Sequence, residues 1–123
     1  MWDERSGRII WVDIVGKALH STDPESGATT TQPMPKAIGI AVPRRSGGFM
    51  GALEDGFYAI DVGGRTERIV AIDTRGGRLR FNDGACDPAG RFLAGTMAWD
   101  QSPAAGALYR LDPDLTARAC WTT

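Results

Sequence analysis

Arg80 and Asn82 are the residues whose types and spacing could bind a polar small molecule, with Phe81 between them. A guanidinium offers paired N–H donors to ligand oxygens, and a side-chain amide donates and accepts at once, which suits a ligand with several hydroxyls. An Arg-x-Asn pair entering a strand is structural in most proteins. The pair is therefore a candidate ligand-binding site, and the rest of the chain must show whether it is functional or structural.

The other reactive side chains give weaker signals. His20 is the only histidine and is predicted to lie at the surface or in packing. Cys86 and Cys120 are 34 residues apart and form no C-x-x-C pattern, so buried reduced thiols are expected rather than a disulfide or metal site. Asp83, beside a glycine, is predicted to be a turn residue or to support the site from behind. Four tryptophans are expected to pack within the fold, not to form a stacking platform: Trp2, Trp11, Trp99 and Trp121.

The charge balance excludes several classes of partner. Lys and Arg number 14 against 15 Asp and Glu, which gives a net charge of −1. Nucleic acids and anionic membranes usually demand clustered positive charge, so neither is an expected partner. The longest apolar runs, such as 9–12, are far too short to cross a bilayer. These features predict a cytoplasmic protein.

A phrase that repeats along the chain gives the elements that must position these residues. In each copy a polar turn closed by glycine precedes a short aromatic and aliphatic run, which is typical of a turn followed by a strand. If Gly7, Gly48 and Gly90 are equivalent, the spacings are 41 and 42 residues. The three copies span residues 3–12, 43–52 and 86–95.

A second phrase follows each copy, in which a glycine leads into strand-like residues that stop at an aspartate: 16–23, 56–61 and 106–112. No stretch keeps a helical period, because Gly or Pro interrupts every window long enough. Two hairpins in about 40 residues are typical of a β-propeller blade. A β-sandwich is the competing all-β fold, but it does not require a regular repeat.

The sequence thus predicts a partial propeller of about three blades over residues 1–123. Propellers usually close with about four to eight blades, and closure protects their inner faces. Three blades alone would expose apolar faces at both ends. Either the chain self-associates through these faces or it is part of a longer protein.

Three ordered motifs resemble the gluconolactonase/regucalcin (senescence marker protein) family. The most specific is 80–84 (Arg-Phe-Asn-Asp-Gly) followed by 87–92 (Asp-Pro-Ala-Gly-Arg-Phe) and 94–97 (Ala-Gly-Thr-Met). The stretches 2–14 and 106–112 match in the same order. The resemblance implies a six-bladed propeller that hydrolyses sugar lactones or related small esters with one divalent metal ion: calcium, zinc or magnesium.

The same resemblance assigns substrate contacts to Arg80 and Asn82. Asp100 falls where many members carry a substrate-binding glutamate, one methylene longer. The family's metal ligands, a glutamate before the position of Trp2 and an asparagine and aspartate beyond Trp121, have no counterpart here. We therefore expect the chain to be truncated at both ends, to lack catalytic and metal-binding residues, and to bind no metal by itself. The alternative is a non-catalytic propeller fragment that acts as a binding or assembly module.

Overall fold

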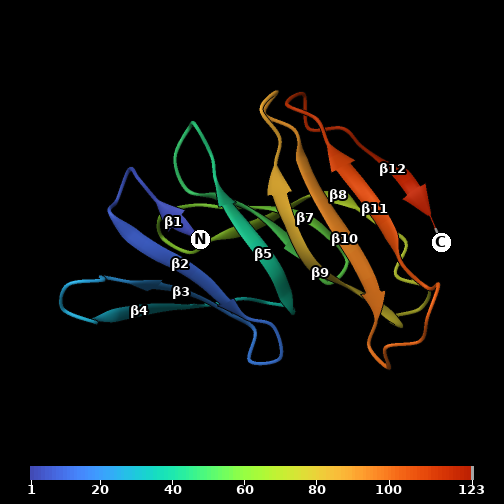
Figure 1. Cartoon of the computed structure of the whole chain (residues 1–123), viewed down its shortest axis with the longest axis horizontal. Helices are drawn as coiled ribbons and strands as arrows, with labels where there is room; N and C mark the ends of the chain where they lie inside the picture. The colour runs from blue at the N-terminus through green and yellow to red at the C-terminus, as the bar shows by residue number, and fades with distance from the viewer. Residues whose placement is uncertain (123) are drawn as a thin grey trace.

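The computed structural model describes residues 1–122, which form twelve β-strands and no helix. They make three four-stranded antiparallel sheets, each built from strands consecutive in the sequence. In Figure 1 the first sheet lies at the left, the third at the right, and β5 between them. The all-β partial propeller predicted from the repeat is confirmed. No helix in residues 1–122 is long and apolar enough to cross a membrane.

The strands have the following bounds. The first sheet holds β1 (Trp2–Asp3), β2 (Arg8–Asp13), β3 (Ala18–Thr22) and β4 (Thr29–Pro33). The second holds β5 (Ile38–Pro43), β6 (Phe49–Leu53), β7 (Gly56–Ile60) and β8 (Thr66–Ala71). The third holds β9 (Leu79–Cys86), β10 (Phe92–Ala98), β11 (Ala107–Leu111) and β12 (Ala117–Thr122).

The two repeated phrases coincide with the same elements of every sheet. The first phrase is the hairpin between the first and second strands, and the second phrase is the third strand. One detail of the alignment is wrong. The N–H of Gly47 donates to the carbonyl of Arg44, as the N–H of Gly90 donates to that of Asp87, so Gly47 rather than Gly48 is the counterpart of Gly90. Two adjacent glycines with positive φ make the choice ambiguous in the sequence.

The second sheet is covered on both faces, and this sandwiched arrangement makes the core. Along β6, Phe49 and Leu53 face the first sheet, whereas Met50 and Ala52 face the third. This alternation follows from the period of two in a strand. The core facing the first sheet includes Ile10, Leu19, Met34, Ile38, Ala41, Tyr58 and Ile60. The core facing the third sheet includes Val42, Phe57, Phe81, Phe92, Ala94 and Leu111.

A bulge at Gly39 lets β5 serve both cores. The register between β5 and β6 shifts between Ile38 and Ile40, so these two residues reach opposite faces despite their spacing of two. Gly39 also lies against β9, where a Cβ atom would stand 2.6 Å from the carbonyl oxygen of Phe81. Only glycine permits this close approach, and it fixes the position of β9 beside β5.

The structure corrects the burial expected for the cysteines and tryptophans. Both cysteines are free, as predicted, but both are exposed. Cys86 lies at the edge of a hairpin, and Cys120 is the residue at a register shift in β12. The four tryptophans are likewise exposed rather than buried within blades. The pattern of residue types indicates strands but not which sheet faces are covered.

His20 lies where the sequence places it, at the surface and in packing. Its ring stacks on Trp11 with centroids 4.1 Å apart, and its Nδ1 is 2.8 Å from the hydroxyl of Thr31. These contacts join β2, β3 and β4 across one face of the first sheet. These contacts give His20 a packing role in the first sheet.

Tyr58 should make stability pH-dependent in alkali. Burial, together with a 2.8 Å hydrogen bond to Asp55, raises the pKa of Tyr58 to about 12 from 10.0. The contribution of Tyr58 to stability is fully present below pH 10, its pKa in the unfolded chain, and is lost as the pH rises toward 12, its pKa in the folded chain. We expect the urea midpoint to fall over this range in the native chain and to fall less in Tyr58→Phe. Spectrophotometric titration of Tyr109→Phe, which leaves Tyr58 as the one tyrosine, reads the pKa directly.

Candidate functional site

Asn82 owes its exposure to a bulge in β9, the innermost strand of the third sheet. Phe81 pairs with Thr96 and Asp83 pairs with Gly95, so Asn82 has no partner in β10. Phe81 is fully buried in the core, whereas Asn82 is exposed. A bulge re-aims one side chain without interrupting the sheet, and such features are common next to functional sites.

Arg80 lies beside Asn82 and is held over an aromatic ring. Its Nη1 donates to the carbonyl of Phe81 at 3.1 Å and to the Oδ1 of Asn82 at 3.4 Å. Its Cζ lies 4.9 Å from the ring centroid of Trp99, within the range of a cation–π contact. The buried Nε has no hydrogen-bond partner among the described atoms. The structure thus brings Arg80 and Asn82 together.

Asp100 is not in direct contact with this pair. Its Oδ1 accepts hydrogen bonds from the N–H of Ser102 at 3.0 Å and from the Ser102 hydroxyl at 2.5 Å. These bonds, with the nearby charge of Arg78, lower the pKa of Asp100. The carboxylate therefore remains ionised near neutral pH, where it can accept a hydrogen bond but not act as an acid. It follows Trp99 directly, so it lies one residue from the ring that supports Arg80.

Asp83 does not occupy a turn. It lies inside β9 opposite Gly95, and its Oδ1 accepts from the N–H of Gly84 at 2.8 Å. The glycine beside it suggests a turn, but here that glycine permits close strand packing, since a Cβ at Gly84 would lie 2.2 Å from the carbonyl of Leu93. Asp83 therefore supports the local backbone next to the bulge.

Trp99 is the site residue that sequence reasoning missed. Its residue type predicts packing between blades, whereas the structure places its half-exposed ring under the guanidinium of Arg80. The backbone N–H of Trp99 donates to the carbonyl of Arg78, which ties the start of β9 to the end of β10. The signal in the sequence is its position directly before Asp100, a candidate site residue.

The described residues do not fit the divalent metal ion that the family resemblance implies. Such an ion needs several oxygen ligands that converge at about 2.0–2.6 Å. Residues 1–122 contain no group of three or more His, Cys, Asp or Glu side chains that could hold a metal ion. The part of the chain that carries Arg80 and Asn82 therefore offers ligand-binding groups but no metal centre.

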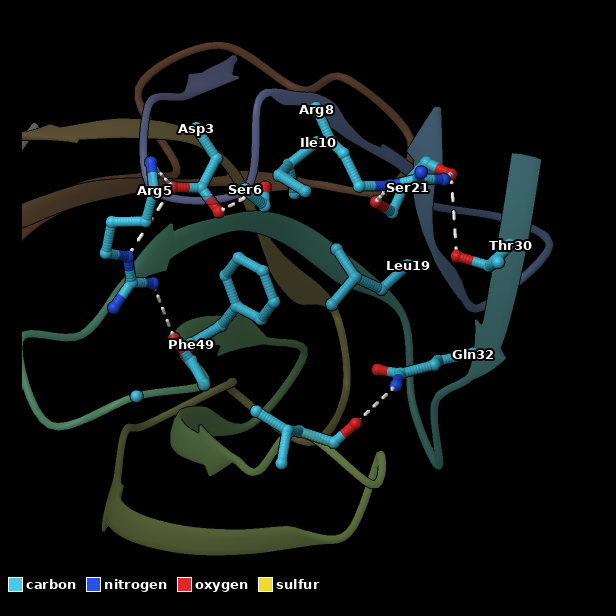
Figure 2. A pocket seen from close by; sticks show the side chains of 13 residues that line it. Asp3, Arg5, Ser6, Arg8, Ile10, Leu19, Ser21, Thr30, Gln32 and Phe49 are labelled. Atoms are coloured by element: carbon cyan, nitrogen blue, oxygen red, sulfur yellow. Dashed lines mark hydrogen bonds and ion pairs between the residues drawn. The ribbon is translucent and has the colours of Figure 1, made fainter. Parts of the chain in front are cut away.

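A cavity of about 490 Å³ lies elsewhere, between the first and second sheets (Figure 2). Asp3, only 5% exposed, accepts a hydrogen bond from the hydroxyl of Ser6 at 2.8 Å and forms an ion pair with Arg5 at 3.5 Å. Arg5 also donates to the carbonyls of Arg44 and Gly48, in the turn between β5 and β6 of the second sheet. These polar groups form hydrogen bonds and an ion pair with one another and join the first sheet to the second. We therefore assign the polar residues of this cavity a structural role.

Three consecutive four-stranded antiparallel sheets, packed face to face, define a partial β-propeller. Strand β9 of the third sheet carries the pair of Arg80 and Asn82. The chain belongs to the SMP-30/gluconolactonase/LRE-like family, whose profile matches residues 1–121. The family assignment made from the three motifs is thereby confirmed.

Two curated relatives show the range of the family. The chain is 37% identical over 119 residues to a 6-deoxy-6-sulfogluconolactonase of Pseudomonas putida, covering 96% of this chain and 41% of the relative. It is 36% identical over 116 residues to regucalcin of Danio rerio, covering 93% of this chain and 39% of the relative. The chain thus spans about 40% of the length of the curated relatives that it matches.

Solved structures agree with this fold. A luciferin-regenerating enzyme superposes with a TM-score of 0.88 at 28% identity, over 98% of this chain and 43% of that one. Regucalcin of Agrobacterium tumefaciens, described as a calcium-binding protein, gives a TM-score of 0.91 at 23% identity, over 99% of this chain and 41% of that one. The second likeness is used for the fold alone.

Proposed function

We propose that this chain carries the substrate-recognition part of a protein that hydrolyses sugar lactones or related small esters. The observation that carries the proposal is the exposed Asn82 at the β9 bulge, hydrogen-bonded to Arg80 above Trp99. The family and the 37% identity to a sulfogluconolactonase support a lactone as the substrate class. The sequence-based assignment of Arg80 and Asn82 is retained as part of this proposal.

The chemistry of the pair suits a polyhydroxylated acid or its lactone. The guanidinium donates to carbonyl or carboxylate oxygens, and the Asn82 amide can donate to one hydroxyl and accept from another. The Trp99 ring restrains the guanidinium, so less rotamer freedom is lost when the ligand binds. The role we propose for the ionised Asp100 is to accept a hydrogen bond from a substrate hydroxyl at the edge of the site.

Metal-dependent hydrolysis is proposed for the complete family architecture rather than for the residues of this chain alone. A divalent ion such as calcium, zinc or magnesium would supply Lewis acidity when bound. The described residues provide no ligand cluster for it. We therefore expect this chain to bind substrate or product without accelerating hydrolysis appreciably. We also propose a cytoplasmic location, which the two free cysteines support.

Ligand binding tests the recognition proposal directly. D-gluconate, a stable sugar acid, should shift the backbone amide NMR signals of β9 in the native chain. Loss of a hydrogen bond to a charged group costs about 1.5–3 kcal/mol, so Arg80→Gln should weaken binding about 10- to 150-fold. Arg75→Gln, which removes an exposed arginine in the turn before β9, is the matched control and should bind normally.

Two results would overturn the proposal. One is equal gluconate affinity in the native chain and in Arg80→Gln. The other is binding whose NMR shifts map to the cavity between the first and second sheets instead of β9. A parallel lactone-hydrolysis assay with added calcium, zinc or magnesium separates recognition from catalysis, because acceleration that survives Arg80→Gln would place the chemistry elsewhere.

The alternative is a binding or assembly module without catalysis. The observation that favours it is the exposure of large apolar side chains on the outer faces of the first and third sheets: Trp2, Ile9, Trp11 and Trp121. Such faces usually mark interaction sites. The two functions are compatible, since recognition by β9 does not use these tryptophans.

A further inference from the structure

Within residues 1–122, the first and third sheets each have one face that no other sheet covers, and we call these two the end faces. Each corresponds to a face that is buried at another sheet of the chain. In the second strand of each sheet, alternate residues point to the preceding and to the following sheet. Those facing the following sheet are Ile10 and Val12 in β2, and Met50 and Ala52 in β6. Those facing the preceding sheet are Phe49 in β6, and Phe92 and Ala94 in β10.

The same rule identifies what each end face would pack against. Ile9 and Trp11 in β2 lie on the face of the first sheet that turns away from the second, and both are exposed. Leu93 in β10 lies on the face of the third sheet that turns away from the second. Leu108 and Trp121 lie on the same face, because Leu108 pairs with Gly95 of β10 and Trp121 pairs with Leu108. The exposed face of the first sheet therefore corresponds to a face that packs on a preceding sheet. The exposed face of the third sheet corresponds to one that packs on a following sheet.

We propose that two copies of this chain associate head to tail, with the first-sheet face of each copy packed on the third-sheet face of the other. This arrangement repeats at both junctions the kind of packing seen twice within one chain. The number of sheets favours a second copy of this chain as the partner. One chain supplies three sheets and spans 41–43% of the solved relatives, so a second copy supplies three more sheets and nearly completes their length.

The size of the faces is sufficient for a stable pair. Four strands about 4.8 Å apart, each with about five residues at 3.3 Å, give a face of roughly 300 Å² in plan. Two such contacts, counted on both copies, remove on the order of 1,200 Å² or more of accessible surface, which reaches the range of stable interfaces. Contacts between unlike faces close into a ring only when the rotation between copies completes a circle. In the proposed pair each copy supplies half of the ring, so a two-fold axis relates the copies and both end faces of each copy are covered.

A groove on the third-sheet face gives the contact a defined shape. It has a volume of about 300 Å³ and is lined by residues of β10, β11 and β12, including Met97, Leu108 and Trp121. On the opposing face, Trp11 is half-exposed and its ring is fixed by stacking on His20 and by a 2.9 Å hydrogen bond to Thr22. A large, restrained aromatic side chain facing an apolar groove is a common centre of binding energy.

Light scattering on the purified 123-residue chain tests the proposal. The expected mass is twice the 13.2 kDa of one chain, with no larger species as concentration rises. Trp11→Glu and Trp121→Glu should each raise the dissociation constant at least about 30-fold, as expected for loss of a central tryptophan. Val62→Glu, on a side chain 84% exposed in the β7–β8 turn, is the control and should remain dimeric.

Mixing the two variants tests the head-to-tail geometry. One junction of the mixed dimer is native, so an equimolar mixture should regain dimer that neither variant forms alone. A monomeric native chain, an open-ended series of oligomers, or a dimer that survives either substitution would overturn the proposal. Circular dichroism verifies that each variant is folded, and Ile9→Glu with Leu93→Glu repeats the experiment at independent positions of the same faces.

Discussion

Phe57→Ala is expected to lower the free energy of unfolding by about 3–5 kcal/mol, which is a large part of the total stability of a domain of this size. Phe57 is fully buried between the second and third sheets. Its ring centroid lies 5.1 Å from that of Phe81 and 5.6 Å from that of Phe92, so truncation opens a cavity beside two aromatic rings. Urea denaturation followed by circular dichroism measures the loss.

The matched control is Val62→Ala, because Val62 is apolar and largely exposed in the turn after β7. Exposed substitutions usually change stability by less than about 0.5 kcal/mol. A loss below about 1 kcal/mol in Phe57→Ala would show that the second and third sheets do not share the core described above. Because Phe81 separates Arg80 from Asn82, the same variant should also loosen the position of the candidate site.

Gly39→Ala is expected to destabilise the fold by about 1–3 kcal/mol and to weaken sugar-acid binding together with it. The new Cβ would lie 2.6 Å from the carbonyl oxygen and 2.7 Å from the carbonyl carbon of Phe81, and 3.0 Å from the amide nitrogen of Asn82. These are backbone atoms, so no side-chain rotation relieves the clash. β9 must move away from β5, and the bulge that exposes Asn82 moves with it.

Gly95→Ala distinguishes this effect from a general cost of replacing a strand glycine. Gly95 lies in β10 with no positive φ, and the nearest atom to its added Cβ is the carbonyl oxygen of Ala107 at 3.9 Å. That is ordinary contact, so its stability should be unchanged or rise slightly. If Gly39→Ala matched Gly95→Ala in both urea midpoint and gluconate affinity, β9 would not depend on the close approach of β5.

The repeat makes much of the fold predictable. Glycine-closed turns followed by short apolar runs predict the hairpins correctly, because turn chemistry and strand alternation are local properties. The spacing of the phrases then predicts three similar sheets. The family assignment rests on the order of three motifs, which is likewise contained in the sequence.

The candidate site is only partly predictable. Arg80 and Asn82 are identified by resemblance, and the structure brings them within hydrogen-bonding distance. Trp99 is not identified, because its contact with Arg80 joins the start of β9 to the residue after β10 and depends on strand register. Asp100 matches by position, yet its carboxylate bonds to Ser102. Its role as a substrate contact remains a prediction.

The sequence by itself determined that the chain is built from repeated antiparallel strands and carries an Arg-x-Asn pair of one family. Only the tertiary structure decided what that pair faces. A register shift in β9 exposes Asn82, Trp99 supports Arg80, and Gly39 sets the distance between β5 and β9. It also decided which apolar residues are covered, because a strand's alternation gives it two faces but does not specify which face has a neighbour.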